Sequence, residues 1–509
     1  MMDRRIMIGQ KLVTGLPGTE VTEEFIQLVK EHKVGNVILF ARNIASPEQL
    51  RNLCADLQEL IQKETGIPAF ITIDQEGGIT SRLGAPATVI PGAMGAAATG
   101  KPEYAFEAGR ITGEELLACG VNFDLAPDMD VNSNPLNPVI GARSYGDQPE
   151  KVAEFGIQMM KGLGAGGVLS CIKHFPGHGD TAVDSHLGLP CIDKSMEELD
   201  RCELLPFKKA IEEGAPAVMT THILFPQIET NNVPATMSPT ILQGILREKL
   251  GFKGLILSDC MMMDAIAQHY GTVKGTCAAA MAGVDMIFIC HSNPLTAEAC
   301  TELDKLLPDD MLQESFDRIM AAKKCIPEEI PPFANVGCEE HVKKAAEMFR
   351  ASITFAGGPT VELPSLGNKP LFVGCAPFQT TQANNPEENG MSISHVLSNA
   401  LGGAAYPCVP TPDEAERAKV VDMAKEHTSV VISTFNAHLR NEQRKLVEAL
   451  CELDIPVICV AMRNPYDLSG LTEKAWCLAA YDYTADAIHA IRDILAGKLQ
   501  CTGTCPVQL

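Results

Sequence analysis

Short apolar runs alternate with longer amphipathic stretches from residue 35 onward. Apolar runs bounded by turn residues predict buried strands, and they occur at 35–40, 69–74, 121–127, 168–175, 217–223, 254–259 and 284–290. Stretches of helical character follow them, for example at 102–119, 149–163, 195–213 and 238–250. This alternation predicts parallel strands joined by right-handed crossovers.

Nearly every predicted strand ends in a polar or ionisable side chain. These side chains are Asp74, Asp128, Lys173, His174, His222, Asp259 and His291. A buried sheet has no structural need for such ends, whereas the loops at the carboxyl ends of barrel strands build active sites. We therefore predict a (β/α) TIM-type barrel of seven or eight units over residues 1–330, with an open doubly wound sheet as the alternative.

A second alternation of strands and helices follows the first. Apolar runs occur at 371–375, 429–435, 457–462 and 475–481. They predict a smaller αβα sandwich domain over residues 351–509. A segment with three prolines and no period lies at 325–340, and we place a linker at 331–350. No G-x-G-x-x-G pattern follows the strands of the second domain, so a nucleotide-binding role is unsupported.

Composition narrows the class of protein. The chain has 64 acidic against 41 basic residues, a net charge of −23, and such a surface repels nucleic acid and anionic membranes. No apolar run reaches the ~18 residues of a membrane span, and we expect no signal peptide. The 18 cysteines contain no Cys-x-x-Cys pair and are typical of the thiols of a cytoplasmic protein.

Titratable side chains are densest in the stretch IKHFPGHGDTAVDSHLGLP, residues 172–190. Three of the 12 histidines, His174, His178 and His186, lie there beside Asp180 and Asp184. These residues could bind a metal, or a histidine oriented by a carboxylate could act as a general acid and base. A third interpretation is a glycine-rich loop that only packs over the barrel mouth. The loop alone leaves all three open.

Asp259 shifts the balance between these interpretations. An aspartate at a strand end is often only the cap of the next helix. Here, however, it would face the same mouth as Asp74, Lys173 and His174. A carboxylate nucleophile with a separate proton donor is what cleavage of a glycosidic bond requires. Basic side chains that could hold the groups of a sugar are Lys173, Arg143 and Arg82.

Several motifs resemble glycoside hydrolase family 3, in its β-N-acetylglucosaminidase branch. They include VGNVILFARNI, IDQEGG, NFDLAPDMDVN, GARSYGDQP, KHFPGHGDTAVDSHLGLP and GFKGLILSDCMMMDAI, which follow one another through the first domain. RNPYDL (463–468) and GTCPV (503–507) are similar to the second, αβα domain of that family. DTAVDSH is the most specific of these motifs.

The resemblance implies a role for each matching residue. Asp259 matches the nucleophile, His186 the general acid and base, and Asp184 the residue that orients His186. The residues that match those gripping the terminal N-acetylglucosamine are Asp74, Arg143, Lys173 and His174, with Arg82 beside them. Two positions depart from the pattern, because Ile79 stands where the branch usually has arginine, and Cys260 where a second aspartate commonly follows the nucleophile.

The implied activity is that of an exo-acting, retaining β-N-acetylglucosaminidase. With one tryptophan and 5% aromatic residues, the chain favours a pocket for one terminal sugar over a long polysaccharide cleft. The family suggests small glycans or muropeptides as substrates, in cytoplasmic peptidoglycan turnover, with no cofactor, catalytic metal, nucleic acid or membrane. Two alternatives are a phosphorylase, which would use phosphate as acceptor, and a metal-dependent hydrolase that uses the His/Asp loop.

Overall fold

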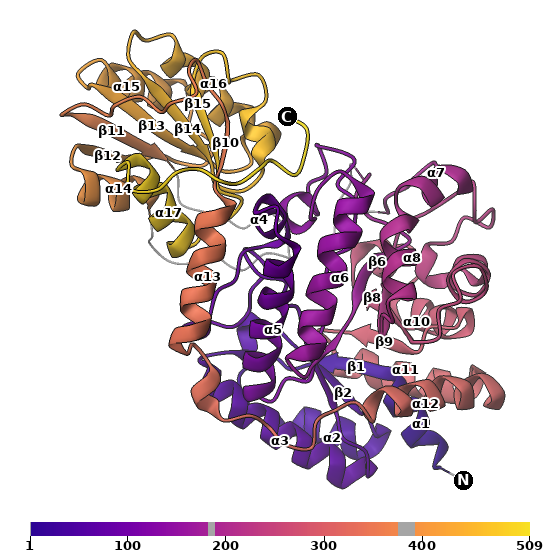
Figure 1. Ribbon diagram of the computed structural model, residues 1–509. Helices are drawn as coiled ribbons and strands as arrows, with labels where there is room; N and C mark the ends of the chain where they lie inside the picture. The colour runs from indigo at the N-terminus through magenta and orange to yellow at the C-terminus, as the bar shows by residue number, and fades with distance from the viewer. Residues whose placement is uncertain (1, 182–188, 375–391) are drawn as a thin grey trace.

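The computed structural model describes residues 2–181, 189–374 and 392–509. Its first sheet is a parallel barrel in the strand order β5-β4-β3-β2-β1-β9-β8-β7-β6 (Figure 1). The strands of the barrel are β1 (Leu12–Gly15), β2 (Asn36–Leu39), β3 (Phe70–Ile73), β4 (Phe123–Asp124), β5 (Leu169–Ser170), β6 (Ile172–Phe175), β7 (Ala217–Thr220), β8 (Leu255–Cys260) and β9 (Met286–Ile289).

The barrel closes through one stretch of chain. β5 pairs with β4 on one side, and β6, one residue further along, pairs with β7 on the other. The amides of Cys171 and Lys173 continue the contact with β4 by donating to the carbonyls of Ala126 (2.9 Å) and Pro127 (3.2 Å). Residues 169–175 therefore act as one strand that joins the two ends of the sheet.

Helices surround the barrel. They are α1 (Arg4–Lys11), α2 (Glu23–His32), α3 (Pro47–Thr65), α4 (Ala93–Ala98), α5 (Pro102–Ala118), α6 (Pro149–Ala165), α7 (Met196–Arg201), α8 (Leu204–Glu212), the π-helical η4 (Thr240–Lys249), α9 (Asp264–Ala267), α10 (Thr272–Ala282), α11 (Asn293–Leu306) and α12 (Asp309–Lys323). Short 3₁₀ turns lie at η1 (Ala41–Asn43), η2 (Gly141–Arg143) and η3 (Ala235–Met237).

The termini of α3 show how local sequence sets an element. The Ser46 hydroxyl accepts a hydrogen bond from the Gln49 amide, and Pro47 occupies the first turn. Proline is preorganised for that position, because its fixed φ suits a helix and it has no N–H to satisfy. Gly66, with φ of 74°, ends the helix in the left-handed conformation, which a residue without a Cβ adopts readily.

The second sheet has the order β10-β15-β14-β13-β11-β12. All its neighbouring strands are parallel except β10, which runs antiparallel to β15. The strands are β10 (Thr354–Gly357), β11 (Pro370–Gly374), β12 (Ala404–Pro407), β13 (Ser429–Thr434), β14 (Val457–Ala461) and β15 (Trp476–Ala479). The helices are α14 (Ile393–Leu401), α15 (Glu414–Ala424), α16 (Asn441–Cys451), α17 (Ala485–Leu495) and the short turns η6 (Ala437–Leu439) and η7 (Pro465–Leu468).

Each face of this second sheet has its own hydrophobic core. Side chains of α15 and α16, such as Val420 and Leu446, pack on one face. Side chains of α14 and α17, such as Leu397 and Ile491, pack on the other. The two layers of helices confirm the predicted αβα sandwich, and the parallel barrel confirms the predicted TIM-type domain.

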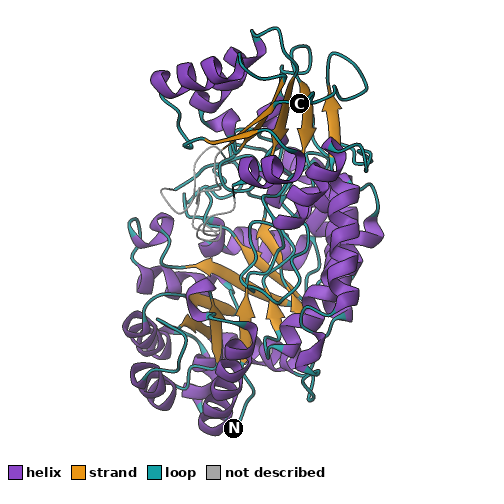
Figure 2. Ribbon diagram, turned by 90° about the vertical axis from the view of Figure 1, so that its left-hand side faces the viewer, coloured by secondary structure: helices purple, strands orange, loops and turns teal. Residues whose placement is uncertain are grey.

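The helix α13 (Glu339–Ser352) connects the two sheets, with η5 (Phe333–Asn335) before it. It runs beside α5 on the outside of the barrel and leads to the second domain, which sits over one end of the barrel (Figures 1 and 2). The predicted linker at 331–350 thus contains η5 and most of α13, and the domain boundaries themselves stay a prediction. Within the described ranges, no helix is both long enough and apolar enough to span a bilayer.

Candidate active site

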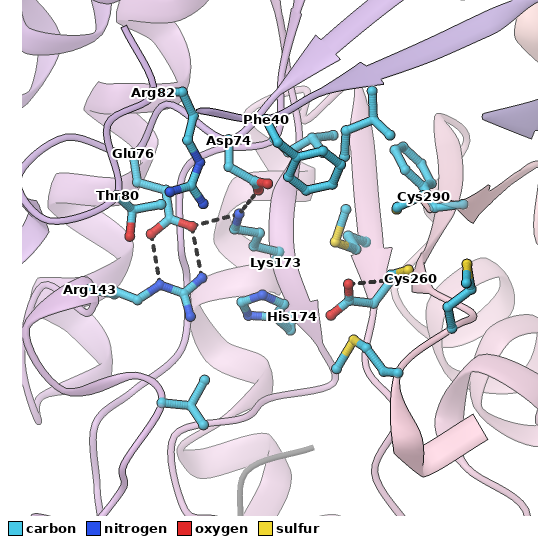
Figure 3. Close-up of a pocket in the computed structure, with 18 of the residues that line it drawn as sticks. Phe40, Asp74, Glu76, Thr80, Arg82, Arg143, Lys173, His174, Cys260 and Cys290 are labelled. Carbon is cyan, nitrogen blue, oxygen red and sulfur yellow. Dashed lines mark hydrogen bonds and ion pairs between the residues drawn. The ribbon is translucent and has the colours of Figure 1, made fainter. Parts of the chain in front are cut away.

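The carboxyl ends of the barrel strands surround a cavity of about 330 Å³. Five of the seven strand-end residues expected at this mouth line it together with apolar and sulfur-containing side chains (Figure 3): Asp74, Lys173, His174, Asp259 and His291. The other two, Asp128 and His222, are buried and are not part of the lining. Its lining includes Phe40, Arg42, Asp74, Glu76, Thr80, Arg82, Arg143, Lys173, His174, His178, Met219, Asp259, Cys260, Met262, Met263, Phe288, Cys290 and His291. Six of the predicted site residues therefore converge on one cavity: Asp74, Arg82, Arg143, Lys173, His174 and Asp259.

One side of the cavity is a network of four charged side chains, which we call the charged wall: Asp74, Glu76, Arg143 and Lys173. Arg143 makes a two-pronged contact with Glu76, Nε to Oε2 at 2.9 Å and Nη2 to Oε1 at 2.8 Å. The Lys173 ammonium lies 2.7 Å from both Glu76 Oε1 and Asp74 Oδ1. Figure 3 shows Glu76 between the two cations, so that it holds both of them in place.

Burial and charge oppose each other in this wall. Burial alone would raise the pKa of Glu76, but Arg143 and Lys173 outweigh it and hold the pKa well below its usual range. Burial alone would lower the pKa of Lys173, but Asp74 and Glu76 raise it above its usual range. The Glu76 carboxylate and the Lys173 ammonium are therefore both charged at neutral pH. Lys173 and Glu76 expose only 2% and 6% of their side chains, so the network is preorganised by its own ion pairs.

His174 is oriented from behind by Asp130. Its Nδ1 lies 2.7 Å from Asp130 Oδ2, which leaves the other ring nitrogen for the cavity that His174 lines. The pairing of β6 with β7 is irregular between Ile172 and Phe175, and both Lys173 and His174 line the cavity although they are consecutive. Such irregularities commonly re-aim side chains next to active sites.

The opposite side of the cavity carries Asp259, at the end of β8. Asp259 Oδ1 accepts a hydrogen bond of 2.6 Å from the amide of Cys260. The surrounding lining is apolar or contains sulfur: Met219, Cys260, Met262, Met263, Phe288 and Cys290. His222, which we expected at the mouth, is buried behind this side, where its Nε2 lies 3.0 Å from the Cys260 carbonyl. We call the side formed by Asp259, Cys260 and Cys290 the nucleophile wall, after the role that the motif resemblance implies for Asp259.

The second domain supports the loops that carry the charged wall. Asp482 Oδ2 accepts a hydrogen bond of 3.0 Å from the Gly92 amide. A Cβ on Gly78 would lie 2.1 Å from Asp482 Oδ1, so only glycine allows this approach next to Glu76. The Asn132 side chain donates to the Tyr466 hydroxyl at 2.8 Å, which joins the RNPYDL segment to the loop after β4.

The structure tests the hypothesis of a metal site in the His/Asp loop. Of the residues proposed for it, His178 has its Nδ1 2.9 Å from the Thr181 hydroxyl, and Asp180 pairs with Lys194 at 2.7 Å. Within the described chain, the residues close enough to share an ion are Asp128, Asp130 and His174. Of the described residues that were proposed as ligands, His174 belongs to this group, whereas His178 and Asp180 do not. Asp184 and His186 lie outside the described residues.

Glu76 is the site residue that sequence reasoning missed. It was visible as part of IDQEGG, but only the fold brings Lys173 from β6 and Arg143 from η2 to it. Asp130 was likewise visible at a strand end, but the sequence did not show that it pairs with His174. Ile79 is half-buried and is not among the residues that line the cavity.

Comparison with known proteins identifies the family. A family model described as the glycosyl hydrolase family 3 N terminal domain matches residues 7–322. The chain belongs to glycoside hydrolase family 3. Beta-hexosaminidase A of Pseudoalteromonas piscicida is 35% identical over 548 residues, which cover 96% of this chain and 91% of that protein.

Two solved members of family 3 extend the comparison. A β-N-acetylglucosaminidase from Paenibacillus sp. str. FPU-7 superposes with a TM-score of 0.93 at 33% identity, covering 100% of this chain and 99% of its own. NagZ from Neisseria gonorrhoeae, in complex with N-trifluoroacetyl-D-glucosamine, matches with a TM-score of 0.57 at 31% identity, covering 67% of this chain and 98% of its own. The chain is therefore a two-domain glycoside hydrolase of this family, and the resemblance stated from its motifs is confirmed.

Proposed function

We propose that this family 3 enzyme is an exo-acting, retaining β-N-acetylglucosaminidase that removes terminal β-linked N-acetylglucosamine from small glycans or muropeptides. The names of its relatives, β-hexosaminidase and β-N-acetylglucosaminidase, support the sugar and the bond. The free thiols of the described cysteines favour a cytoplasmic location, and the resemblance to the family suggests a role in peptidoglycan turnover there. The nucleophile, the acid and the sugar contacts are each part of the proposal.

The observation that carries the proposal is the opposition of the charged wall and Asp259 across one small cavity. At about 330 Å³, the cavity is at the lower end of the range for ligand pockets, about 300–1,000 Å³, which suits one sugar unit. The charged wall offers ammonium, guanidinium and carboxylate groups that can hydrogen-bond sugar hydroxyls or an acetamido group. A sugar held there would present its anomeric carbon to Asp259.

In the proposed mechanism the Asp259 carboxylate attacks the anomeric carbon as the bond to the leaving oxygen breaks. His186, oriented by Asp184, protonates that oxygen, and the product is a glycosyl ester on Asp259. His186 then takes a proton from water, which displaces Asp259 and restores the β configuration. A histidine suits this role, because its ordinary pKa lies near neutrality. We base the roles of His186 and Asp184 on the DTAVDSH motif alone.

Water rather than phosphate is the acceptor in our proposal. The curated relative is named a β-hexosaminidase and the Paenibacillus structure a β-N-acetylglucosaminidase, which does not favour a phosphorylase. An assay of a β-GlcNAc aryl glycoside with and without phosphate tests the choice. We expect free N-acetylglucosamine of β configuration in both cases, whereas a sugar 1-phosphate would refute hydrolysis. Loss of activity with EDTA and its return with Zn²⁺ would instead support the metal-dependent alternative.

A series of leaving groups tests the proposed acid. An aryl group of low pKa departs almost unaided, so His186→Ala should retain glycosylation with it and lose far more activity with a natural sugar leaving group. His269→Ala, which alters an exposed histidine outside the cavity lining, is the control and should behave as wild type across the series. Equal losses across the series in His186→Ala would place the acid elsewhere.

A further inference from the structure

Two thiols lie together in the nucleophile wall. Cys260 ends β8 directly after Asp259, and Cys290 directly follows β9 (Figure 3). Both line the catalytic cavity, and neither is in a disulfide. The proposed reaction gives neither thiol a role, and an aspartate would commonly occupy position 260 in this branch of the family.

The strand pairing explains why the two side chains meet. β8 and β9 are parallel neighbours, with Cys260 opposite Phe288 and the Met261 amide donating to the Phe288 carbonyl at 2.8 Å. Side chains two residues apart in a strand point to the same face. Cys290 therefore emerges on the same side as Phe288 and Cys260, and both thiols lie at the carboxyl ends of neighbouring strands and line the same cavity.

The two thiols are chemically unequal. The hydrogen bond from Cys290, together with backbone amides, lowers the pKa of Cys260 below its usual range, although burial and Asp259 act against this. Burial and the same hydrogen bond raise the pKa of Cys290 well above its usual range. The Arg42 guanidinium, which donates to the Cys290 carbonyl at 3.3 Å, adds a positive charge nearby. A thiolate is the reactive form of cysteine, so the lower pKa favours Cys260 as the attacking sulfur.

We propose that Cys260 and Cys290 form a dithiol modification site that hydrogen peroxide oxidises to a disulfide. The Cys260 thiolate attacks one peroxide oxygen, the O–O bond breaks, and hydroxide leaves, which takes up the thiol proton as water. The product at Cys260 is a sulfenic acid. The Cys290 sulfur then attacks the Cys260 sulfur, the S–O bond breaks, and a second water leaves. Two thiols supply the two electrons that the peroxide accepts.

The disulfide would act directly on the nucleophile. The Cys260 amide holds Asp259 Oδ1 at 2.6 Å, and a disulfide must bring two sulfurs to about 2.05 Å. Drawing Cys260 toward Cys290 therefore displaces the hydrogen bond that orients Asp259, in a wall shared with the sugar. The oxidised enzyme should be inactive and recover with a thiol reductant. This consequence for activity rests on the proposed function, whereas the disulfide itself does not.

Mass spectrometry tests the disulfide without reference to activity. The reduced full-length protein is treated with hydrogen peroxide, its remaining thiols are alkylated, and it is digested with trypsin. We expect residues 254–274, which contain Cys260, to be cross-linked to residues 275–305, with fragment ions that select Cys290 over Cys277 and Cys300. Cys260 found alkylated, or oxidised without a cross-link, at peroxide doses that modify the exposed Cys191 would overturn the proposal.

Activity after the same treatment tests the consequence. Wild type should lose most of its activity and regain it with dithiothreitol. Cys260→Ser lacks the attacking sulfur and, compared with its own reduced activity, should show no dithiothreitol-reversible loss. Cys191→Ser, which alters an exposed thiol, should behave as wild type. A wild-type cross-link that leaves activity unchanged would refute the coupling to Asp259. An enzyme without β-GlcNAc activity in its reduced state would refute the proposed function and leave the cross-link as evidence for the dithiol site.

Discussion

The charged wall and the nucleophile wall of the cavity differ in how their side chains are held. Glu76 is fixed by Arg143 and Lys173 at 2.7–2.9 Å. Asp259, by contrast, lies among methionine, cysteine and phenylalanine side chains and accepts a hydrogen bond from its neighbour's amide. One side of the cavity is a network of ion-paired side chains. The other side presents the Asp259 carboxylate beside apolar and sulfur-containing side chains.

This difference separates two tasks that one cavity must perform. Binding a polar sugar calls for donors and acceptors that are already in place, because ordering them on binding would cost free energy. Attack on carbon calls for a carboxylate near few competing polar groups, where its charge acts at low dielectric constant. A change at Glu76, the buried carboxylate that pairs with both cations of the charged wall, should therefore cost mainly stability. A change at Asp259 should cost mainly activity.

Asp259→Ala should have the largest effect on activity. Without the carboxylate no glycosyl ester can form, so kcat should fall by several orders of magnitude while the thermal midpoint stays near that of wild type. Asp264→Asn, outside the cavity lining, is the matched control and should keep full activity. If the variant instead unfolds at a much lower thermal midpoint, so that unfolding accounts for its lost activity, Asp259 is a structural residue. The contrast between the two walls would then be removed.

Glu76→Gln should have the largest effect on stability. It would leave Arg143 and Lys173 buried without their shared carboxylate, and removing one partner of a buried ion pair costs about 3–5 kcal/mol. Chemical denaturation should reveal this loss, with lower kcat/KM as its accompaniment. Glu197→Gln, which alters an exposed pair with Arg201, should change stability by about 1 kcal/mol or less. Equal stability of the two variants would show that the charged wall is not held by Glu76.

Asp74→Asn should act mainly on binding. Its side chain is 20% exposed and faces the cavity, and Lys173 keeps its contact with Glu76 when Asp74 is changed. A charged hydrogen bond to a sugar hydroxyl contributes about 1.5–3 kcal/mol, so kcat/KM should fall by the corresponding factor with little change in thermal midpoint. Unchanged kcat/KM would exclude Asp74 from the sugar contacts.

Asp482→Asn should change folding stability by an amount that depends on pH. Burial raises the pKa of Asp482 to about 7, so the folded state binds the proton more tightly than the unfolded state. Folding stability in wild type should therefore fall as pH rises from about 4 to about 7. The variant lacks this titration, so its thermal midpoint relative to wild type should be higher at pH 8 than at pH 5. A difference that does not change with pH would contradict the assignment.

The sequence predicted most strands because buried parallel strands are apolar runs. It missed β1, whose Leu12–Gly15 is short and follows the polar Gln10 and Lys11. Lys11 is buried there because its ammonium donates to the Val284 carbonyl (2.9 Å) and the Ser315 hydroxyl (2.6 Å). β10 and β12 were also missed, since they lie at the edges of the second sheet and are less apolar.

The site was predictable as far as each residue lies at a strand end. Asp74, Lys173 and Asp259 each follow an apolar run, and parallel strands bring such ends to one face. Pairwise contacts across the barrel were not predictable, because they depend on how loops after different strands meet. Glu76 pairs with Arg143 and Lys173, which are far away in sequence. Gly78 must be glycine because Asp482 of the other domain packs against it.

Trapping of the covalent intermediate tests the central claim most directly. A 5-fluoro or 2-fluoro analogue of the N-acetylglucosamine substrate with a good leaving group should form its ester faster than the ester is hydrolysed. After digestion, the label should lie on residues 254–274, and fragment ions should assign it to Asp259 rather than to Asp264 in the same peptide. A label on Asp264 or Asp74, or inactivation without any labelled peptide, would contradict the account.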